Sequence, residues 1–273
     1  WQVRVWDKDG KPSEWSARQK IRIAPASADL SAGGITPRWI GAITKADARL
    51  PEGRFSNAEF KKDYFKEKWN AVDSLSARSI IMRKGFSNDG RTVTDAVAYV
   101  SGMGHYEMRI NGKKVGDSEF APLWSEYSKT VYYNTYDVTS LLTGGHNAIS
   151  LLLGNGFFNV QRGNRYSKLM TSFGAPQMIL RLGINYSDGT SQTIVSDGSW
   201  KYALSPITFN SIYGGESFDA RLTQSGFDLA HFDDTEWKDA VLTEGTDGKL
   251  SPQTAPPVKI MERFAIKEWH YLP

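Results

Sequence analysis

The chain has 273 residues, 40% of them hydrophobic, which is enough for one large core or two smaller ones. It carries 33 Lys and Arg against 30 Asp and Glu, without a long basic run, and so lacks the charge pattern of a nucleic-acid-binding protein. The absence of cysteine excludes disulfides, thiolate catalysis and zinc–thiolate sites. No apolar run approaches the roughly 20 residues of a membrane-spanning helix.

The N-terminal residues predict a short hairpin followed by a linker. Trp1–Trp6 alternates as a strand, Asp9-Gly10 marks a turn, and Gln19–Ile23 is a second strand. A two-stranded hairpin is not stable alone in water. Residues 1–24 resemble the last strands of a fibronectin-type-III-like sandwich, through the patterns W-x-V-x-V-W-D and S-x-W-S. Residues 25–34, rich in Ala, Ser and Gly, are expected to form a linker.

One helix of ordinary length is expected, at Ala58–Trp69, where aromatic residues recur at roughly helical spacing. Ser56 or Asn57 can cap its N-terminus. The segment Lys61–Lys68 mixes acidic and basic residues, which indicates a solvated helix face.

Most of the remaining chain predicts consecutive antiparallel strands. The expected strands are Arg78–Phe86, Val93–Ser101, His105–Ile110, Val131–Tyr136, Asn147–Leu153, Met178–Tyr186, Ser191–Ser196, Trp200–Ala203 and Ile207–Ile212. Asn111-Gly112 is the strongest hairpin signal, and Gly154-Asn155-Gly156 is expected to form a tight turn at a strand end. The pattern indicates an all-β, jelly-roll or galactose-binding-like β-sandwich over residues 35–245, followed by a connector into the next domain at 246–273.

Five motifs follow one another in this region, and a sixth segment comes after them. They are G-M-G-H-Y-E (102–107), I-N-G-K-K-V-G (110–116), Y-S-K (127–129), Y-D-V-T (136–139) and L-G-N-G (153–156), then G-E-S-F-D-A-R (215–221). Together these motifs resemble the N-terminal β-domain of bacterial α-L-rhamnosidases. The resemblance implies a part that scaffolds or binds carbohydrate, in an enzyme that removes terminal α-L-rhamnose from glycosides or plant polysaccharides.

The resemblance also implies where catalysis takes place. The family inverts the anomeric configuration, which requires a carboxylic acid and a carboxylate base across the scissile bond. In the family, both belong to a large helical toroid downstream of the β-domains. This chain predicts at most one ordinary helix, so no catalytic residue is assigned. Because the chain starts at Trp1 inside a structural pattern, we expect a fragment of an exported protein, periplasmic or extracellular, which the absence of cysteine fits.

Two loops carry aromatic side chains beside amide and guanidinium groups, a combination typical of carbohydrate sites at the end of a jelly roll. The residues predicted to bind sugar are Trp124, Tyr127, Phe157, Phe158, Asn159, Arg162, Asn164, Arg165 and Tyr166. The expected ligands are rhamnosylated glycans. The alternatives are a solvated loop or a contact with a neighbouring domain.

Glu216, Asp219 and Arg221 are predicted to form a polar network that docks this domain on its neighbour, because a guanidinium can hold a carboxylate with two hydrogen bonds. The alternative is a carboxylate cluster close to a sugar site.

No cofactor is expected. The four histidines are scattered without metal-ligand spacing. Related rhamnosidase modules bind rhamnose through calcium, as the resemblance implies, and Asp137, Asn155 and Asn164 offer oxygens of the kind Ca²⁺ prefers. Neither a phosphate-binding loop nor a G-x-S-x-G nucleophile elbow is present. A free-standing carbohydrate-binding or adhesion module and a purely structural β-domain remain the alternative functions.

Overall fold

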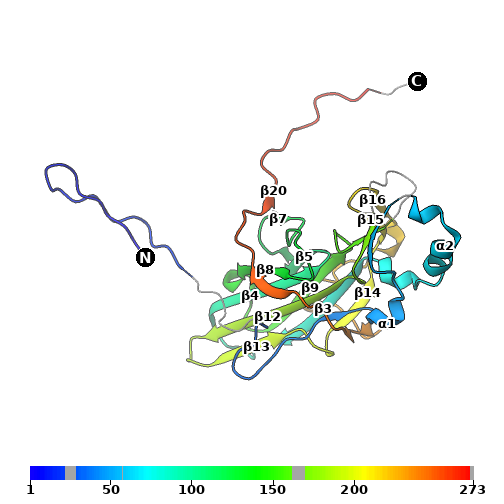
Figure 1. Ribbon diagram of the computed structural model, residues 1–273. Helices are drawn as coiled ribbons and strands as arrows, with labels where there is room; N and C mark the ends of the chain where they lie inside the picture. Colours follow the sequence, from blue (N-terminus) through cyan, green and yellow to red (C-terminus); the bar gives the residue numbers. More distant parts are fainter. Residues whose placement is uncertain (22–28, 57, 162–169, 271–273) are drawn as a thin grey trace.

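The structure is a computed structural model that describes residues 1–21, 29–56, 58–161 and 170–270. Two β-sheets pack face to face (Figure 1). The first sheet contains β1 (Ile40–Gly41), β4 (Val93–Met103), β8 (Thr130–Asp137), β12 (Gln177–Tyr186), β13 (Ser191–Val195), β18 (Val241–Leu242) and β19 (Lys249–Pro252). Its strand order is β18-β1-β12-β4-β8-β19, with β13 beside β12. The all-β prediction is confirmed.

The second sheet has six strands in the order β17-β14-β3-β9-β5-β6. They are β3 (Ile80–Ser87), β5 (His105–Ile110), β6 (Lys113–Lys114), β9 (His146–Gly154), β14 (Lys201–Leu204) and β17 (Lys238–Asp239). Smaller pairings join β2 (Gly53–Phe55), β10 (Asn159–Val160) and β11 (Met170–Ser172), then β15 (Ile207–Ser211) with β16 (Gly215–Phe218), and β7 (Ser118–Glu119) with β20 (Val258–Lys259).

The core lies between the two large sheets. On β12, Leu180, Leu182 and Ile184 are at most 1% exposed, and they point toward the second sheet because alternate side chains of a strand share one face. On β9, Leu151 and Leu153 are fully buried and meet them from the opposite side. Truncating one such leucine to alanine removes about 2–5 kcal/mol of folding free energy.

The turn between β5 and β6 confirms the hairpin prediction at Asn111-Gly112. Ile110 pairs with Lys113, and both turn residues have positive φ, 49° at Asn111 and 82° at Gly112. Two positive φ values in a two-residue loop are the signature of a type I′ turn, whose twist matches that of the flanking strands.

The helical structure is short. The described helices are α1 (Lys45–Ala48) and α2 (Asp63–Asn70), and 3-10 turns occur at Glu59–Lys61, Ser74–Ala77, Thr139–Leu141 and Ala220–Leu222. The helix expected at Ala58–Trp69 is divided at Lys62, whose backbone is extended (ψ 136°). Ser56 and Glu59 exchange hydrogen bonds as a capping box, while Asn57 lies outside the described residues. Neither described helix is long and apolar enough to cross a membrane.

Residues 25–28 of the linker expected at 25–34 lie outside the described residues, and the rest of that segment contacts the first sheet. Leu30 is fully buried and packs with Val97, Tyr99 and Tyr133 on the outer face of the first sheet. Arg181 Nη1 donates a hydrogen bond to the Leu30 carbonyl at 3.1 Å. The first sheet also extends to β19, past residue 245, where the sandwich was expected to end.

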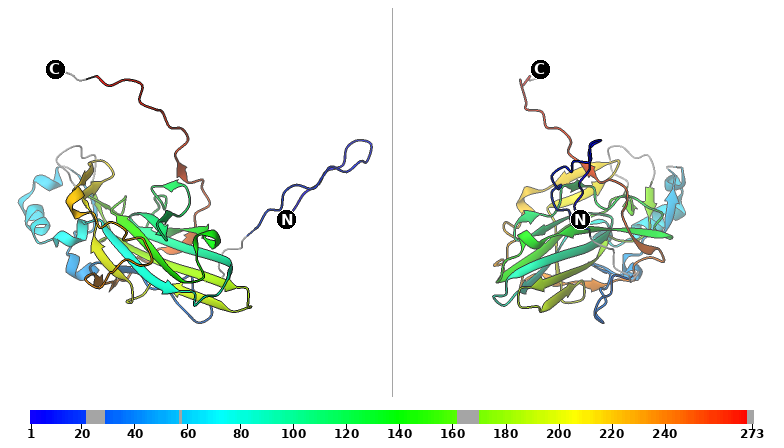
Figure 2. Two further views of the ribbon diagram at one scale, coloured as in Figure 1. Left: turned by 180° about the vertical axis from the view of Figure 1, so that it is seen from behind. Right: turned by 90° about the vertical axis from the view of Figure 1, so that its left-hand side faces the viewer.

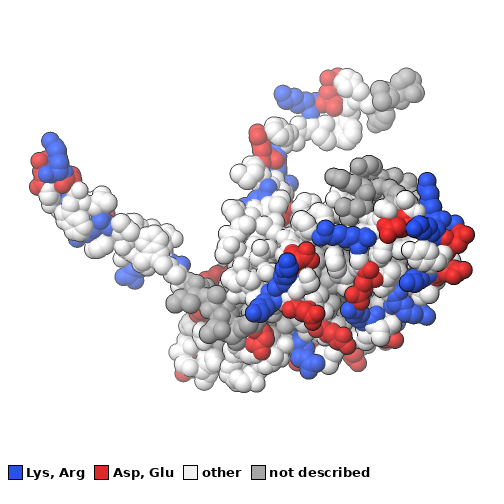
Figure 3. All heavy atoms as spheres, viewed as in Figure 1, with Lys and Arg blue, Asp and Glu red and all other residues white. Residues whose placement is uncertain are grey.

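Both ends of the chain project from the sandwich (Figures 1 and 2). Residues 1–21 form an extended ribbon in which the Arg4 guanidinium stacks on Trp6 and Trp15, and all three tryptophans of this ribbon are more than half exposed. Residues 260–270 are also extended. On the face shown in Figure 3, acidic and basic side chains are intermixed, as the sequence composition predicts.

Candidate functional site

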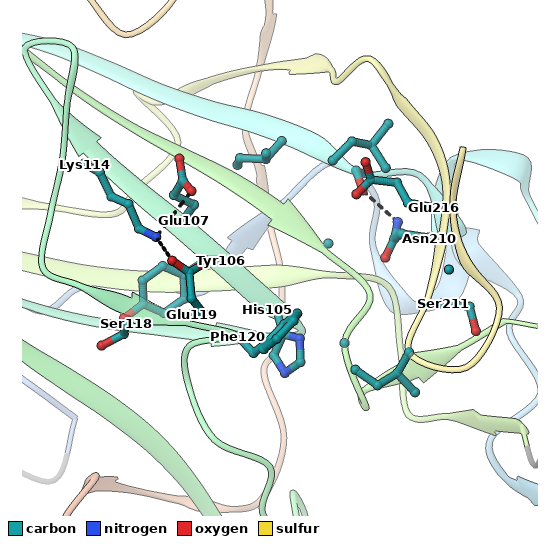
Figure 4. Close-up of a pocket in the computed structure, with 17 residues that line it drawn as sticks. His105, Tyr106, Glu107, Lys114, Ser118, Glu119, Phe120, Asn210, Ser211 and Glu216 are labelled. Atoms are coloured by element: carbon teal, nitrogen blue, oxygen red, sulfur yellow. Dashed lines mark hydrogen bonds and ion pairs between the residues drawn. The ribbon is translucent and has the colours of Figure 1, made fainter. Parts of the chain in front are cut away.

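A cavity of about 390 Å³ opens at the end of the second sheet where β5 begins and β9 ends (Figure 4). Strand β5 contributes His105, Tyr106 and Glu107 to its wall, and β9 contributes Leu152 and Gly154. The hairpin of β15 and β16 forms a second wall, and the segment from Lys114 to Phe120 forms a third. Ser79, immediately before β3, also lines the cavity, so residues from five separate parts of the chain meet around one concave space.

The strand ends at this cavity approach too closely for side chains at two glycines. A Cβ on Gly104 would lie 2.0 Å from the carbonyl oxygen of Gly154, and Gly104 also has a φ of 113°. A Cβ on Gly156 would lie 2.9 Å from the backbone nitrogen of His105. Only glycine allows this approach, so these positions fix the backbone of His105 at the cavity wall.

A network of amide side chains fastens the β15–β16 hairpin to the second sheet. The Asn155 backbone N–H donates to Asn210 Oδ1 at 2.8 Å, and Asn155 Nδ2 donates to the carbonyls of Ala77 at 2.8 Å and Asn210 at 3.2 Å. Asn210 Nδ2 donates to Ser79 Oγ at 2.7 Å. Because Asn155 is fully buried, these bonds replace water contacts it cannot make.

One side of the cavity is charged. Lys114 Nζ lies 2.7 Å from Glu119 Oε1 and 3.7 Å from Glu107 Oε2 (Figure 4). Arg109 Nε donates to Glu107 Oε1 at 2.8 Å. The four side chains are about one-third exposed, so each pair contributes little to stability but orders the polar groups. Glu216, on β16, brings a further carboxylate to the cavity.

His105 is neutral in the folded protein at physiological pH. Burial lowers the pKa of His105 to about 4, because the charged form loses hydration between two aromatic rings. The His105 ring lies 5.6 Å from the Phe120 ring and 6.2 Å from the Phe157 ring, centroid to centroid. Among the described residues no hydrogen bond occupies its ring nitrogens, so a ligand in the cavity can use one as donor and the other as acceptor.

Phe120 is an exposed aromatic side chain on a strained backbone. It is 59% exposed, lines the cavity, and has a φ of 53°, in the left-handed region that bulky residues rarely adopt. Such a conformation costs of order 1–3 kcal/mol and concentrates at functional sites. Phe120 therefore combines an exposed ring at the cavity with a backbone conformation that is uncommon for a bulky residue.

Three of the side chains predicted to bind sugar belong to the core. Tyr127 is 5% exposed, and Phe158 and Asn159 are fully buried. The Tyr127 and Phe158 rings meet edge to face, with centroids 5.1 Å apart, and Asn159 Nδ2 donates to the Ser76 carbonyl at 3.0 Å. The prediction that these three side chains are free to contact a sugar is wrong, because they fill the end of the sandwich.

Of the predicted sugar-binding residues, Trp124 is 54% exposed and Phe157 is partly exposed, and binding of a sugar by them stays a prediction. Their ring centroids are 5.7 Å apart, and the Phe157 ring also lies 6.3 Å from that of Tyr213. The other predicted sugar-binding residues lie outside the described residues; they are Arg162, Asn164, Arg165 and Tyr166.

The predicted polar network is divided by the structure. Asp219 and Arg221 form a two-pronged ion pair, with contacts of 2.8 Å from Nε and 2.6 Å from Nη2. The Arg221 guanidinium lowers the pKa of the Asp219 carboxyl. Glu216 instead lines the cavity. Contact of these residues with a neighbouring domain stays a prediction.

The oxygens suggested for calcium do not converge. Asp137, the last residue of β8, pairs with Val97 in the first sheet and accepts hydrogen bonds from Thr139. Asn155 follows β9 in the second sheet, whose last residue, Gly154, pairs with His105 at the beginning of β5. Asn164 lies outside the described residues. Within the described ranges, no group of three or more His, Asp or Glu side chains is arranged to hold a metal ion.

Three residues in or beside the cavity, Phe120, Tyr213 and His105, were not predicted as site residues, and each carried a weak signal. Phe120 is a single aromatic residue in the short polar stretch before Pro122, much like Trp124 after it. Tyr213 does not line the cavity, but its ring lies 6.3 Å from that of Phe157, and in the sequence it stands between the expected strand Ile207–Ile212 and Gly214-Gly215. His105 belongs to one of the recognised motifs, but only the fold shows that its ring lines a cavity.

Comparison with known proteins gives a consistent result. Residues 91–262 match the family described as "Alpha-L-rhamnosidase N-terminal domain". An α-L-rhamnosidase from Formosa agariphila is 35% identical over 267 residues, which cover 97% of this chain and 27% of that protein. The chain spans between 19% and 27% of the length of the curated relatives that it matches.

Two solved structures share the fold at similar identity. The α-L-rhamnosidase from Dictyoglumus thermophilum superposes with a TM-score of 0.68 at 29% identity, covering 96% of this chain and 26% of that one. The Streptomyces avermitilis α-L-rhamnosidase, solved in complex with L-rhamnose, gives a TM-score of 0.64 at 30% identity, covering 70% of this chain and 19% of that one.

Proposed function

The chain belongs to the α-L-rhamnosidase family through its N-terminal domain, and on that premise we propose that it is a non-catalytic part of an enzyme that removes terminal α-L-rhamnosyl groups. We further propose that the cavity beside His105 and Phe120 binds the rhamnosyl group. The solved relative from Streptomyces avermitilis, which was crystallised with L-rhamnose, supports this choice of sugar.

The observation that carries the proposal is an exposed aromatic ring beside a small cavity whose lining combines apolar and polar side chains. The volume of about 390 Å³ lies near the lower end of the range for small-molecule sites and suits a ligand of one sugar ring. Phe120 offers a flat apolar face, and aromatic residues with polar neighbours favour ligands that are apolar on one face and hydroxylated at the edge. A pyranose has that character.

The remaining lining fits a neutral deoxy sugar. Glu107, Glu119 and Glu216 accept hydrogen bonds from hydroxyl groups, and the neutral His105 can donate or accept. Leu152 and the neighbouring isoleucines of the β15–β16 hairpin give an apolar wall on which the methyl group of a 6-deoxy sugar can pack. The hydroxyl groups and the methyl group of the sugar would therefore contact different walls of the same cavity.

The catalytic reaction belongs elsewhere in the proposed enzyme. The described part of this chain holds two short α-helices, α1 and α2, and no array of helices of the kind that carries the catalytic carboxylates in the family. We therefore expect no hydrolysis of 4-nitrophenyl α-L-rhamnopyranoside by the 273-residue chain above the uncatalysed rate. Turnover that Glu216→Gln abolished would place a catalytic group in this cavity instead.

The binding proposal is tested by titrating the chain with L-rhamnose and following amide chemical shifts. Affinity between millimolar and tens of micromolar is expected, because a single sugar offers few atoms. Phe120→Ala should weaken binding roughly two- to tenfold, the equivalent of about 0.5–1.5 kcal/mol of aromatic contact. Phe264→Ala, at an 83% exposed ring far along the C-terminal segment, is the matched control. No shift at tens of millimolar sugar would reject the proposal.

A further inference from the structure

The aromatic pair Trp124 and Phe157 continues the cavity outward without lining it. Neither residue contributes to the cavity wall, yet the Phe157 ring lies 6.2 Å from His105, which does. Trp124 follows at 5.7 Å from Phe157. The rings of His105, Phe157 and Trp124 therefore form an unbroken path from the cavity to the solvent.

We propose that the cavity and this aromatic path form one extended site, which binds a rhamnosyl group together with the ring to which it is linked. The inference rests on the proposed function, because it takes the rhamnosyl group to occupy the cavity. It adds the chemical class of the complete ligand: a rhamnoside whose second ring, a sugar or an aromatic aglycone, has a flat apolar face.

Trp124 is not explained by packing. The nearby core cluster contains Tyr127, Val131 and Phe158, with Trp39 and Phe173 at its margin, and excludes Trp124. A tryptophan that is 54% exposed leaves much of its apolar surface in water, although burial of that surface would be favourable. A ligand that covers the indole face supplies the missing contact.

The backbone on both sides of Trp124 is anchored, so the ring is presented by a fixed loop. The Leu123 N–H donates to Gln253 Oε1 at 3.0 Å, and Ser125 Oγ donates to the Thr130 carbonyl at 2.7 Å. Gln253 Oε1 also accepts from Asn134 Nδ2 at 3.1 Å, which ties the loop to β8. A preformed platform binds with a smaller loss of conformational entropy than a loop that must order on binding.

The geometry separates the two parts of the ligand. A single sugar inside the cavity meets Phe120 and His105, because these line the wall, and it stops short of Trp124. Only a ligand that extends out of the cavity reaches the indole. Loss of Trp124 should therefore affect rhamnosides with a second ring and leave a monosaccharide unaffected.

The test compares three ligands on the full 273-residue chain by isothermal titration calorimetry. They are methyl α-L-rhamnopyranoside, 4-nitrophenyl α-L-rhamnopyranoside and an α-L-rhamnosyl-rhamnose disaccharide. The original chain should bind at least one two-ring ligand up to about tenfold more tightly than the methyl glycoside. Trp124→Ala should abolish that preference without changing the Kd of the methyl glycoside. Trp269→Ala, at a 75% exposed tryptophan of the C-terminal segment, should leave all three values unchanged.

The possible outcomes separate the two proposals. A preference for the aryl glycoside alone would support the extended site and identify an aromatic aglycone, and a preference for the disaccharide alone would identify a second sugar. Binding of the methyl glycoside with no preference, or a preference that survives Trp124→Ala, would overturn the extended site and leave the proposed function intact. No binding of any of the three would overturn both.

Discussion

Two aromatic pairs from the same two loops have opposite positions in the fold. Tyr127 and Phe158 form the inward pair, buried with their rings edge to face. Trp124 and Phe157 form the outward pair, beside the cavity. Phe157 and Phe158 are adjacent in the chain, so the difference comes from backbone direction and not from side-chain chemistry.

The two pairs lie close together in the chain, but we expect one to determine stability and the other to determine ligand binding. The inward pair packs with Met103 and Val131 and closes the end of the sandwich. The outward pair lies outside every buried cluster in the described part of the chain. We therefore expect substitutions in the inward pair to change the free energy of unfolding, and substitutions in the outward pair to change ligand binding.

The largest effect is expected for Phe158→Ala. Phe158 is fully buried, so its truncation removes transfer free energy and leaves a cavity, at a cost of about 3–5 kcal/mol. Urea denaturation measures this loss directly, and Phe264→Ala serves as the exposed control. A loss below about 1 kcal/mol would show that this end of the sandwich is not a packed core.

The next effect is the pH dependence that His105 introduces. Its folded pKa of about 4 lies below the ordinary value of 6.5, so the unfolded chain binds more protons between these two pH values. The free energy of unfolding should therefore fall as the pH drops from 6.5 toward 4, by at most roughly 3 kcal/mol. Below pH 4 this contribution should become constant.

Denaturation at pH 7, 5.5 and 4 measures this dependence, and His105→Gln should remove most of it. His146→Gln, at an exposed histidine, should not. Carboxyls such as Asp188 and Asp219 have pKa values below their usual 3.8, so the stability that they contribute is lost only at lower pH. An identical pH profile for His105→Gln and the original chain would show that the imidazole is well hydrated.

A smaller effect is expected for Asn155→Ala. The substitution leaves the carbonyls of Ala77 and Asn210 without their donor at a buried position, at a cost of about 1–3 kcal/mol. The β15–β16 hairpin should also loosen, so L-rhamnose affinity should fall together with stability. Asn185→Ala, at an exposed strand position, is the control for both measurements.

Local sequence signals predicted the scaffold well because they report on local physics. Alternation located β4, β5 and β12, and Asn111-Gly112 fixed the turn between β5 and β6, since few residues accept two positive φ values. The division of the expected helix at Lys62 was not visible, because helical spacing continues across that residue.

The site was predicted only in part because burial in a loop depends on distant contacts. Phe157 and Phe158 have the same local surroundings in the sequence, and only the core formed with Tyr127 and Phe173 shows which one points inward. The position of His105 likewise depends on the close approach of Gly104, which lies between β4 and β5, and Gly154, at the end of β9. No spacing along the chain encodes that approach.

The smallest effect on stability is expected for Trp124→Ala. Trp124 is 54% exposed and belongs to no buried cluster of the described residues. Its neighbours hold the loop through Leu123 N–H and Ser125 Oγ, neither of which the substitution removes. The free energy of unfolding should change by less than about 0.5 kcal/mol, as for most surface substitutions. Urea denaturation beside Phe158→Ala gives the direct contrast. A loss above about 2 kcal/mol would mean that the indole is a structural group, and the division between an inward and an outward pair would then fail.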